Sequence, residues 1–431
     1  MTMKHFKLCF ILLFLFSMIA NGQEKKEEPK FGINFSGYVK TDIYTDSRQI
    51  VNLREDHFLI YPENQKLDIN GIDINAKNHT GILSIQSRIT GKITGPDVLK
   101  AKTSAMIEAD FFGNENQTFV DINGFRLRHA IIKLNWKTTE LLVGQYWHPL
   151  FITECFPDVV SFNTGAPFQP FSRTPQIRLS QTTGKFKMIF TASEQRDFLS
   201  TGPDGSNHKY LSNAVIPDMN FNLQYSHLWN ETNEFLIGAG FEYKQIVPRL
   251  SATADINIKD GVDSIYYAAD DKVKSSAVSV YTKLRLKPVT FKAYAILGSN
   301  MFDHVMLGGY AVTSINKTPE LRYDYDPVKI LSMWAEISTN GKIQGAIFAG
   351  YTRNLGTDVD NTGIYYSRGS NINSVYRVSP RLIMNFGKLR IAPEIEITAA
   401  QYGKANVRGV VDSGLITVSN IRALLAFYYF F

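Results

Sequence analysis

The chain has 431 residues, a formal net charge of +6 and an aromatic content of 13%, with 29 Phe and 21 Tyr but only 4 Trp. After residue 20, no segment approaches the roughly 18 consecutive apolar residues of a membrane-spanning helix. This composition leaves two classes, a soluble all-β protein or a membrane barrel whose strands alternate polar and apolar residues. The mild charge disfavours a nucleic-acid partner.

The N-terminus predicts export from the cytoplasm. Two lysines precede an apolar stretch of about a dozen residues, and a small-residue cleavage site follows at Gly22, so residues 1–22 form a predicted signal peptide. Its removal leaves a net charge of +4 and Cys155 as the one cysteine, which rules out an intramolecular disulfide. Residues 23–30 are a charged tail, predicted to be flexible, and residues 31–431 are the predicted barrel domain.

Beyond the tail, polar and apolar side chains alternate with period two. The alternation is clear at residues 34–43 and recurs at 220–227, 234–244 and 389–398. Such strands face two different environments. A soluble sandwich places its polar face outside, whereas a membrane barrel places it in the lumen, and the periodicity fits both.

Connection lengths separate the two cases. Very short turns lie at residues 135–139, 182–185, 229–232, 286–288, 339–342 and 385–388, and between them lie long polar connections at about 148–174, 196–217, 248–272, 300–327, 353–371 and 403–413. Strict alternation of short turns and long loops is typical of outer-membrane barrels, whose periplasmic turns are tight and whose extracellular loops are long.

This alternation predicts sixteen antiparallel strands in one all-β transmembrane barrel. They lie near residues 31–46, 80–94, 102–113, 124–136, 139–147, 175–184, 185–195, 218–230, 232–247, 273–287, 288–299, 328–339, 342–352, 372–386, 388–402 and 414–431. The even count places both termini in the periplasm, and sixteen strands enclose an aqueous channel. Residues 47–79 are interpreted as a long first loop, with residues 67–76 as an alternative extension of the sheet.

The C-terminus supports the barrel independently. Leu425, Phe427, Tyr429 and Phe431 fall on one face of the last strand. The pattern looks like the signal by which outer-membrane barrels are recognised by their assembly machinery. In a soluble protein such a terminal strand would promote aggregation.

Two stretches resemble the trimeric DcaP-like porins of the outer membrane of Gram-negative bacteria. The first runs from Gly144-Gln145-Tyr146-Trp147-His148-Pro149-Leu150-Phe151 to Phe171-Ser172-Arg173-Thr174-Pro175-Gln176-Ile177-Arg178, and the second comprises Gln86-Ser87-Arg88, residues 92–96 and residues 108–113. The resemblance implies a homotrimer of sixteen-stranded barrels, a third loop folded inward at the constriction, and a preference for small organic anions. Residues 23–30 are too short for the N-terminal helical segment of some relatives.

Charged residues on the predicted strands should face the lumen, because a charge that faces lipid costs about 2–4 kcal/mol at the bilayer midplane. Arginine suits an anion-binding eyelet, since its planar fork holds a carboxylate or phosphate with two bonds. The acidic residues either oppose the arginines across the pore or pair with them and hold the loop. The candidate constriction residues are Arg88, Arg126, Arg128, Arg173, Arg178, Lys187, Glu108, Asp110, Glu154 and Asp158.

The sequence therefore predicts a porin that passes small hydrophilic solutes by passive diffusion through the outer membrane, with a preference for small organic anions and with no cofactor. The alternatives are a phosphate- or carboxylate-specific channel of the same build and a surface recognition barrel with an occluded lumen. Catalysis is not expected: His148, Ser161 and Asp158 match no catalytic triad, and no Gly-x-Ser-x-Gly motif is present. No Cys/His metal cluster is visible in the sequence either.

Overall fold

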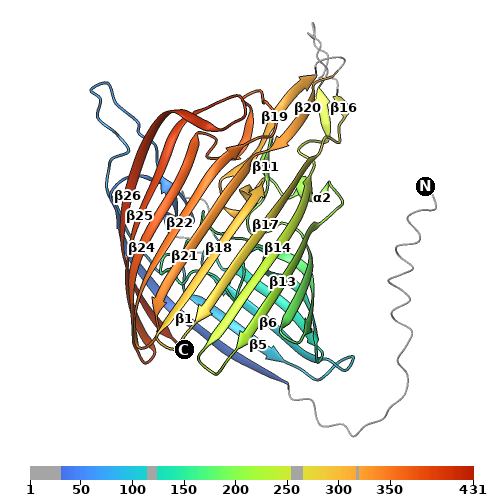
Figure 1. Ribbon diagram of the computed structural model, residues 1–431, viewed down its shortest axis with the longest axis vertical. Coiled ribbons are helices and arrows are strands. Elements are labelled where there is room, and N and C mark those ends of the chain that lie inside the picture. Colours follow the sequence, from blue (N-terminus) through green and yellow to red (C-terminus); the bar gives the residue numbers. More distant parts are fainter. Residues whose placement is uncertain (1–30, 114–123, 254–265, 317–319) are drawn as a thin grey trace, which may run out of the picture.

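The computed structural model describes residues 31–113, 124–253, 266–316 and 320–431. The predicted signal peptide and charged tail lie outside these residues. The chain forms one closed antiparallel β-barrel, shown in Figure 1. The wall segments are β1 (Gly32–Asp46), β4 (His79–Leu83), β5 (Arg88–Thr94), β6 (Lys102–Asp110), β7 (Arg126–Asn135), β8 (Thr139–Trp147), β9 (Arg173–Thr183), β10 (Phe186–Ser193), β13 (Asp218–Leu228), β14 (Glu234–Ile246), β17 (Val273–Arg285), β18 (Val289–Ser299), β21 (Lys329–Thr339), β22 (Ile343–Gly356), β24 (Ile372–Phe386), β25 (Leu389–Ala405) and β26 (Val411–Phe430).

The wall sheet has 17 segments, but β4 and β5 both pair with the same side of β1 and form one interrupted strand. The barrel therefore has sixteen wall strands, which confirms the predicted fold class. The predicted strand at 80–94 is broken between Leu83 and Arg88. Side chains bridge the break, because the Lys40 backbone N–H donates to Ser87 Oγ (3.0 Å) and the hydroxyls of Thr41 and Ser84 share a hydrogen bond (2.8 Å).

Two further boundaries differ from the sequence prediction. β25 continues to Ala405 and β26 begins at Val411, so the last long connection shrinks to residues 406–410. Residues 67–76 do not extend the barrel sheet: they hold only an isolated bridge between Leu67 and Asp73, and Ile69 is 99% exposed. The alternation of the sequence in this segment reflects a small exposed turn.

Shorter elements lie in the long loops at one end of the barrel. They are β2 (Ile50–Leu53), β3 (Phe58–Pro62), β11 (Thr201–Gly202), β12 (Gly205–Ser206), α2 (Lys209–Ser212), β15 (Ser251–Thr253), β16 (Tyr266–Ala268), η3 (Phe302–His304), β19 (Gly308–Asn316), β20 (Arg322–Pro327) and β23 (Tyr365–Arg368). β19 pairs with β20 and β23 in a small sheet above the wall. The opposite end carries the short turns (Figure 1).

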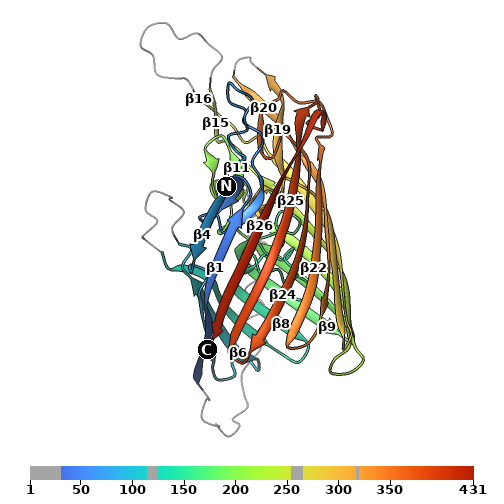
Figure 2. The same cartoon turned by 90° about the vertical axis from the view of Figure 1, so that its left-hand side faces the viewer.

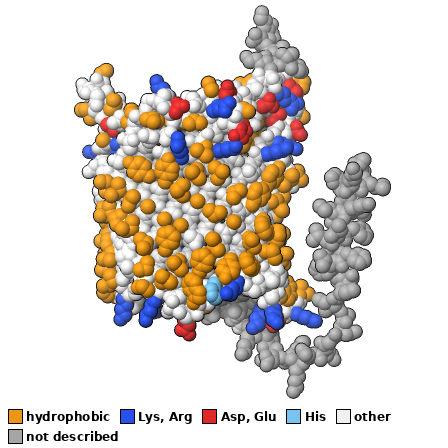
Figure 3. Space-filling model, viewed as in Figure 1, with side chains coloured by type: hydrophobic (Ala, Val, Ile, Leu, Met, Phe, Trp, Pro, Cys, Tyr) orange, Lys and Arg blue, Asp and Glu red, His pale blue; other side chains and the backbone are white. Residues whose placement is uncertain are grey.

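Side chains alternate across the wall as the period-two pattern predicts. On β1, Val39 and Ile43 face outward, whereas Lys40 and Asp42 are buried inside. Figure 3 shows the consequence, a band of hydrophobic side chains between two rims where charged groups gather. This is the surface that a hydrocarbon layer requires.

The barrel closes where the first strand meets the last, and Figure 2 shows β1 between β4 and β26. Residues 38–46 of β1 pair with residues 422–430 of β26, and Phe431 exchanges both backbone hydrogen bonds with Gly37 (3.2 and 3.3 Å). The predicted assembly-signal residues Leu425, Phe427 and Tyr429 lie on this seam, with Phe427 and Tyr429 exposed on the outer face.

We expect Gly37→Ala to impair closure. A Cβ at Gly37 would lie 2.1 Å from the Arg88 carbonyl oxygen and 2.7 Å from the Phe431 ring, so the backbone of the seam would have to shift. The fraction of folded barrel, measured by heat-dependent mobility on a denaturing gel, should fall several-fold. Gly345→Ala on β22 is the matched control, because nothing lies within 4 Å of its added Cβ. Equal folding of both variants would contradict the role assigned to Gly37.

Candidate functional site

The third loop, residues 148–172, lies inside the barrel and reaches the wall opposite its own strands. Near its start, Tyr294 on β18 donates to the Leu150 carbonyl (3.1 Å). Near its end, Ser332 on β21 donates to the Phe168 carbonyl (3.1 Å). Both wall strands lie far around the barrel from β8 and β9, which carry the loop. The loop therefore spans the lumen, as a constriction loop must.

Charged wall residues hold the middle of this loop. Glu394 on β25 accepts the backbone N–H groups of Val160 and Ser161, the latter at 3.1 Å. Glu396 accepts the side-chain amide of Asn163 (2.6 Å). Both carboxylates are buried, and backbone and amide donors satisfy part of the hydrogen-bonding need that burial creates. The lumen charges therefore act partly as anchors.

The first loop also turns inward, which the sequence did not predict. Its β2–β3 hairpin packs Phe58 edge-on against Phe162 and Phe171 of the third loop, at ring distances of 5.6 and 5.0 Å. On β24, Arg377 donates to carbonyls of both loops, to Leu59 (3.1 Å) and to Ala166 (2.9 Å). The two loops thus share an apolar core within a polar wall, and this core narrows the lumen.

Beneath the third loop lies a chamber of about 480 Å³. It extends toward the end of the barrel that bears the short turns, because its lining includes Gln344 and Arg390, which follow two of those turns. Three arginines and one carboxylate line it, Arg88, Arg128, Arg390 and Asp158, together with the aromatic side chains Tyr38, Trp147, Phe151, Phe156, Phe162, Phe171, Tyr428 and Phe430. The balance of charge in the chamber is positive.

From this chamber, arginines and carboxylates continue along the inner wall. Arg128 bonds to Glu108 and Asp110 (both 2.8 Å), and Arg126 holds Asp110 with two bonds (3.0 and 2.7 Å). A register shift between β6 and β7 after Glu108 places Arg128 at a bulge. A bulge re-aims a side chain, and here it turns Arg128 toward the two carboxylates.

This line of paired arginines and carboxylates ends at Asp197 in the fourth loop. Arg173 donates two bonds to its carboxylate (2.9 and 2.6 Å), and Arg54 of the first loop and Arg126 lie at 3.3 and 3.5 Å. We call Arg54, Arg88, Arg126, Arg128 and Arg173 the arginine column. Among the described residues, the carboxylates that pair with this column are Glu108, Asp110 and Asp197.

The remaining predicted constriction residues lie outside the arginine column. Arg178 bonds to Gln176 (2.9 Å) and to the Trp147 carbonyl (2.8 Å), beside Lys187 and Glu154, which are 3.9 Å apart. Asp158 pairs with Lys292 on β18 (2.6 Å). The two acidic residues of the third loop thus pair with lysines, whereas Glu108 and Asp110 of the wall pair with arginines.

Sequence reasoning missed several members of this site. Arg54 and Asp197 are separated by 143 residues in the chain, and neither lies on a barrel strand, so no periodicity marks them. In the structure, His148 and Ser161, which were compared with a catalytic triad, contact different residues. His148 bonds to Asp218 on β13 (3.0 Å), whereas the Ser161 N–H donates to Glu394 on β25.

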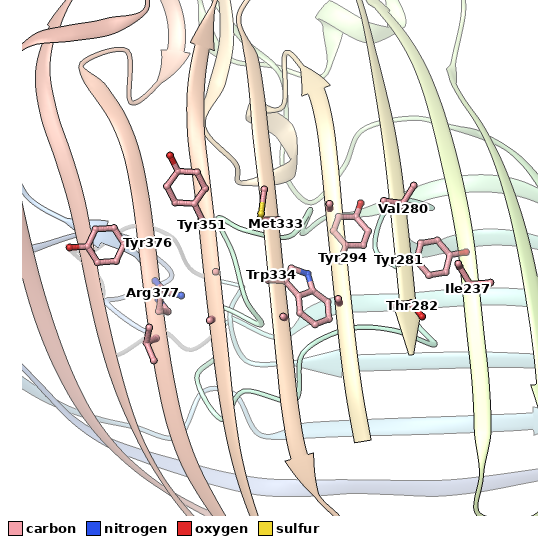
Figure 4. A pocket seen from close by; sticks show the side chains of 16 residues that line it. Ile237, Val280, Tyr281, Thr282, Tyr294, Met333, Trp334, Tyr351, Tyr376 and Arg377 are labelled. Atoms are coloured by element: carbon pink, nitrogen blue, oxygen red, sulfur yellow. The ribbon is translucent and has the colours of Figure 1, made fainter. Parts of the chain in front are cut away.

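A second cavity, of about 620 Å³, crosses the outer wall from β14 to β24 (Figure 4). Alanines such as Ala293 and Ala335 form part of its lining, and Val280 and Met333 beside them are exposed on the membrane-facing side. An apolar groove on this face suits hydrocarbon, so it is no candidate for a hydrophilic solute.

No helix among the described residues is long and apolar enough to cross a membrane.

Solved structures share this architecture. The outer membrane channel DcaP of Acinetobacter baumannii is 16% identical, with a TM-score of 0.64 over 93% of this chain and 97% of that one. The outer membrane protein OmpT of Vibrio cholerae in a trimer form is 10% identical, with a TM-score of 0.51 over 93% and 99%. Its loop L8 deletion mutant is 9% identical, with a TM-score of 0.52 over 93% and 99%. No protein-family model matches the chain, and neither does any curated protein.

The likeness to DcaP confirms, at the level of the fold, the resemblance to DcaP-like porins that the sequence indicated. At these identities the comparison concerns architecture alone. The charges of this lumen must therefore be interpreted from this chain's own residues.

The ion pairs of Asp197 predict that the fold loses stability in acid. Burial alone would raise the pKa of this carboxyl, but Arg173, Arg126 and Arg54 outweigh burial and lower the pKa from 3.8 to about 2. A lowered folded-state pKa stabilises the fold above the unfolded pKa, and the stabilisation is lost as the pH falls from about 4 to about 2. Its size is about 2 kcal/mol.

We therefore expect Asp197→Asn to unfold at a lower temperature than the wild type at pH 7, with a difference that shrinks below pH 4. Thermal unfolding in detergent, followed by circular dichroism, measures this. Asp360→Asn is the control, because this carboxylate is 69% exposed in its pair with Arg408. A constant difference from pH 7 to pH 2 would contradict the assigned charge interaction.

Proposed function

We propose that this protein is an outer-membrane porin that passes small hydrophilic solutes by passive diffusion and prefers small anions. The observation that carries the proposal is the lining of the chamber beneath the third loop, which among the described residues includes Arg88, Arg128 and Arg390 but one carboxylate, Asp158. Charges lining a narrow passage decide which ions enter, since field lines are focused between low-dielectric walls.

Three features support the setting. The predicted signal at residues 1–22 would export the chain, the hydrophobic band fits an outer membrane, and the terminal strand that closes the barrel carries the residues proposed for recognition by the assembly machinery. A homotrimer is proposed as well, supported by the trimer form of the Vibrio cholerae OmpT, which shares the fold. Diffusion needs no bond chemistry, so neither an enzymatic activity nor a cofactor belongs to the proposal.

One observation favours a second candidate, a recognition barrel with an occluded lumen. The first and third loops are joined through Phe58, Phe162 and Phe171, and this apolar core occupies part of the cross-section. A lumen blocked by this core would leave the extracellular loops as the functional surface. The two candidates make opposite predictions for ion conduction.

We expect purified protein in a planar bilayer to conduct in steps grouped in threes, with a reversal potential under a salt gradient that shows anion preference. Arg88→Gln should move the anion-to-cation permeability ratio toward one by a factor of two or more. Arg88 is the variant of choice because its side chain is 21% exposed and its single carboxylate contact, with Glu108, is long (3.7 Å).

Arg408→Gln is the matched control, since this arginine lies in the last extracellular loop and is 59% exposed. Cation preference in the wild type, or equal effects of the two variants, would count against the chamber as the selective element. Folded protein that does not conduct would reject the porin and favour the recognition barrel. Single steps in place of triplets would reject the trimer only.

A further inference from the structure

A cluster of metal-binding side chains lies where the third loop begins. It comprises His148, the first residue of that loop, Asp218 on β13, Glu242 on β14 and His304 in η3 of the sixth loop. One potential ligand atom from each residue lies within 4.8 Å of all the others. All four side chains are at most 3% exposed. Their separation in sequence, up to 156 positions, hides the cluster from any motif.

Buried carboxyl groups outnumber buried ammonium groups around this cluster among the described residues. Lys244 bonds to Asp303 (2.5 Å) and lies 3.8 Å from Glu242. Three buried carboxyl groups, of Asp218, Glu242 and Asp303, therefore face one ammonium group. Burial of the ionised carboxyl groups is costly unless a cation offsets their charge. One divalent cation would do so.

The geometry fits a tetrahedral site after small movements. Nε2 of His148 lies 3.0 Å from Asp218 Oδ2, and Nε2 of His304 lies 3.3 Å from Glu242 Oε1. Around zinc, with bonds of about 2.0–2.2 Å to His and carboxylate ligands, neighbouring ligand atoms are about 3.3–3.5 Å apart. Two imidazoles and two carboxylates suit zinc or a similar transition metal better than calcium or magnesium, which prefer oxygen ligands.

Metal binding would cost one of the two imidazoles a hydrogen bond. The Leu150 N–H donates a long bond to Nδ1 of His148 (3.3 Å), and coordination through Nε2 would break it, because the ring proton moves to Nδ1. Nδ1 of His304 has no hydrogen-bond partner among the described residues, so no such bond is lost there.

We propose that His148, Asp218, Glu242 and His304 bind one divalent transition-metal cation, of which Zn²⁺ fits the donors best. The cation fastens the third loop to the sixth. The backbone of His304 already accepts the Phe171 N–H (2.9 Å) near the other end of the third loop, and His148 N–H donates to Ser172 (3.0 Å). A cation here would hold both ends of the constriction loop in one place, a structural role independent of the transported solute.

The test uses the full chain, refolded in detergent with EDTA and then freed of chelator. Titration with ZnCl₂, followed by calorimetry and by metal analysis after desalting, should give one zinc per chain and a higher unfolding temperature. MgCl₂ at the same concentration should do neither. Wild-type protein that retains no zinc would overturn the proposal and leave a hydrogen-bonded, protonated cluster in its place.

Glu242→Gln should weaken zinc binding at least tenfold, because it removes one ligand charge while keeping the shape of the side chain. His304→Gln should do the same, and the folding of each variant is checked by heat-dependent gel mobility. His208→Gln, an exposed histidine in the fourth loop, is the matched control and should bind as the wild type does. If His304→Gln fails to fold, Glu242→Gln decides, and zinc affinity equal to that of the control would overturn the site.

Discussion

Every backbone polar group that faces hydrocarbon must find its hydrogen-bond partner within the protein, and this requirement governs the molecule. Here it is met by a sheet that closes on itself through β1 and β26. Closure fixes which side chains face lipid and which face the lumen, because neighbours along a strand alternate. Charged wall side chains such as Lys40, Glu394 and Arg377 thereby lie inside, where they hold the third loop.

The lumen uses its charges in two ways. On the wall that meets the third loop, Glu394, Glu396 and Arg377 are occupied by the loop's own amides and carbonyls. On the side of β5 to β9, the arginine column is paired with wall and loop carboxylates. The first wall positions the third loop, and the second joins the wall to the first and fourth loops through Arg54 and Asp197.

The sequence predicted the wall well, because the alternation of polar and apolar residues in a barrel strand is visible in each short segment. Alternation and turn length located sixteen strands. The break between Leu83 and Arg88 escaped prediction, since side-chain bonds to β1 replace the backbone ladder there. Strand ends such as Ala405 lie beyond the prediction because β25 and β26 continue to pair at the end of the barrel that bears the long loops.

The site was less predictable, because its contacts are made between loops. Asp197 gathers three arginines from the first loop, β7 and β9, and nothing in its local sequence marks it. The same holds for the His148 cluster, whose members come from two loops and two strands. The inward fold of the first loop also depends on partners such as Arg377, more than 300 residues away.

Cys155 reports whether the third loop spans the lumen. Its thiol is fully buried against the Thr282 carbonyl of β17 (3.2 Å). Folded protein in detergent should therefore resist a bulky maleimide at Cys155, as read by peptide mass mapping, and should react fully after heat denaturation. Rapid labelling of Cys155 in the folded barrel would place the loop outside the lumen and contradict the account.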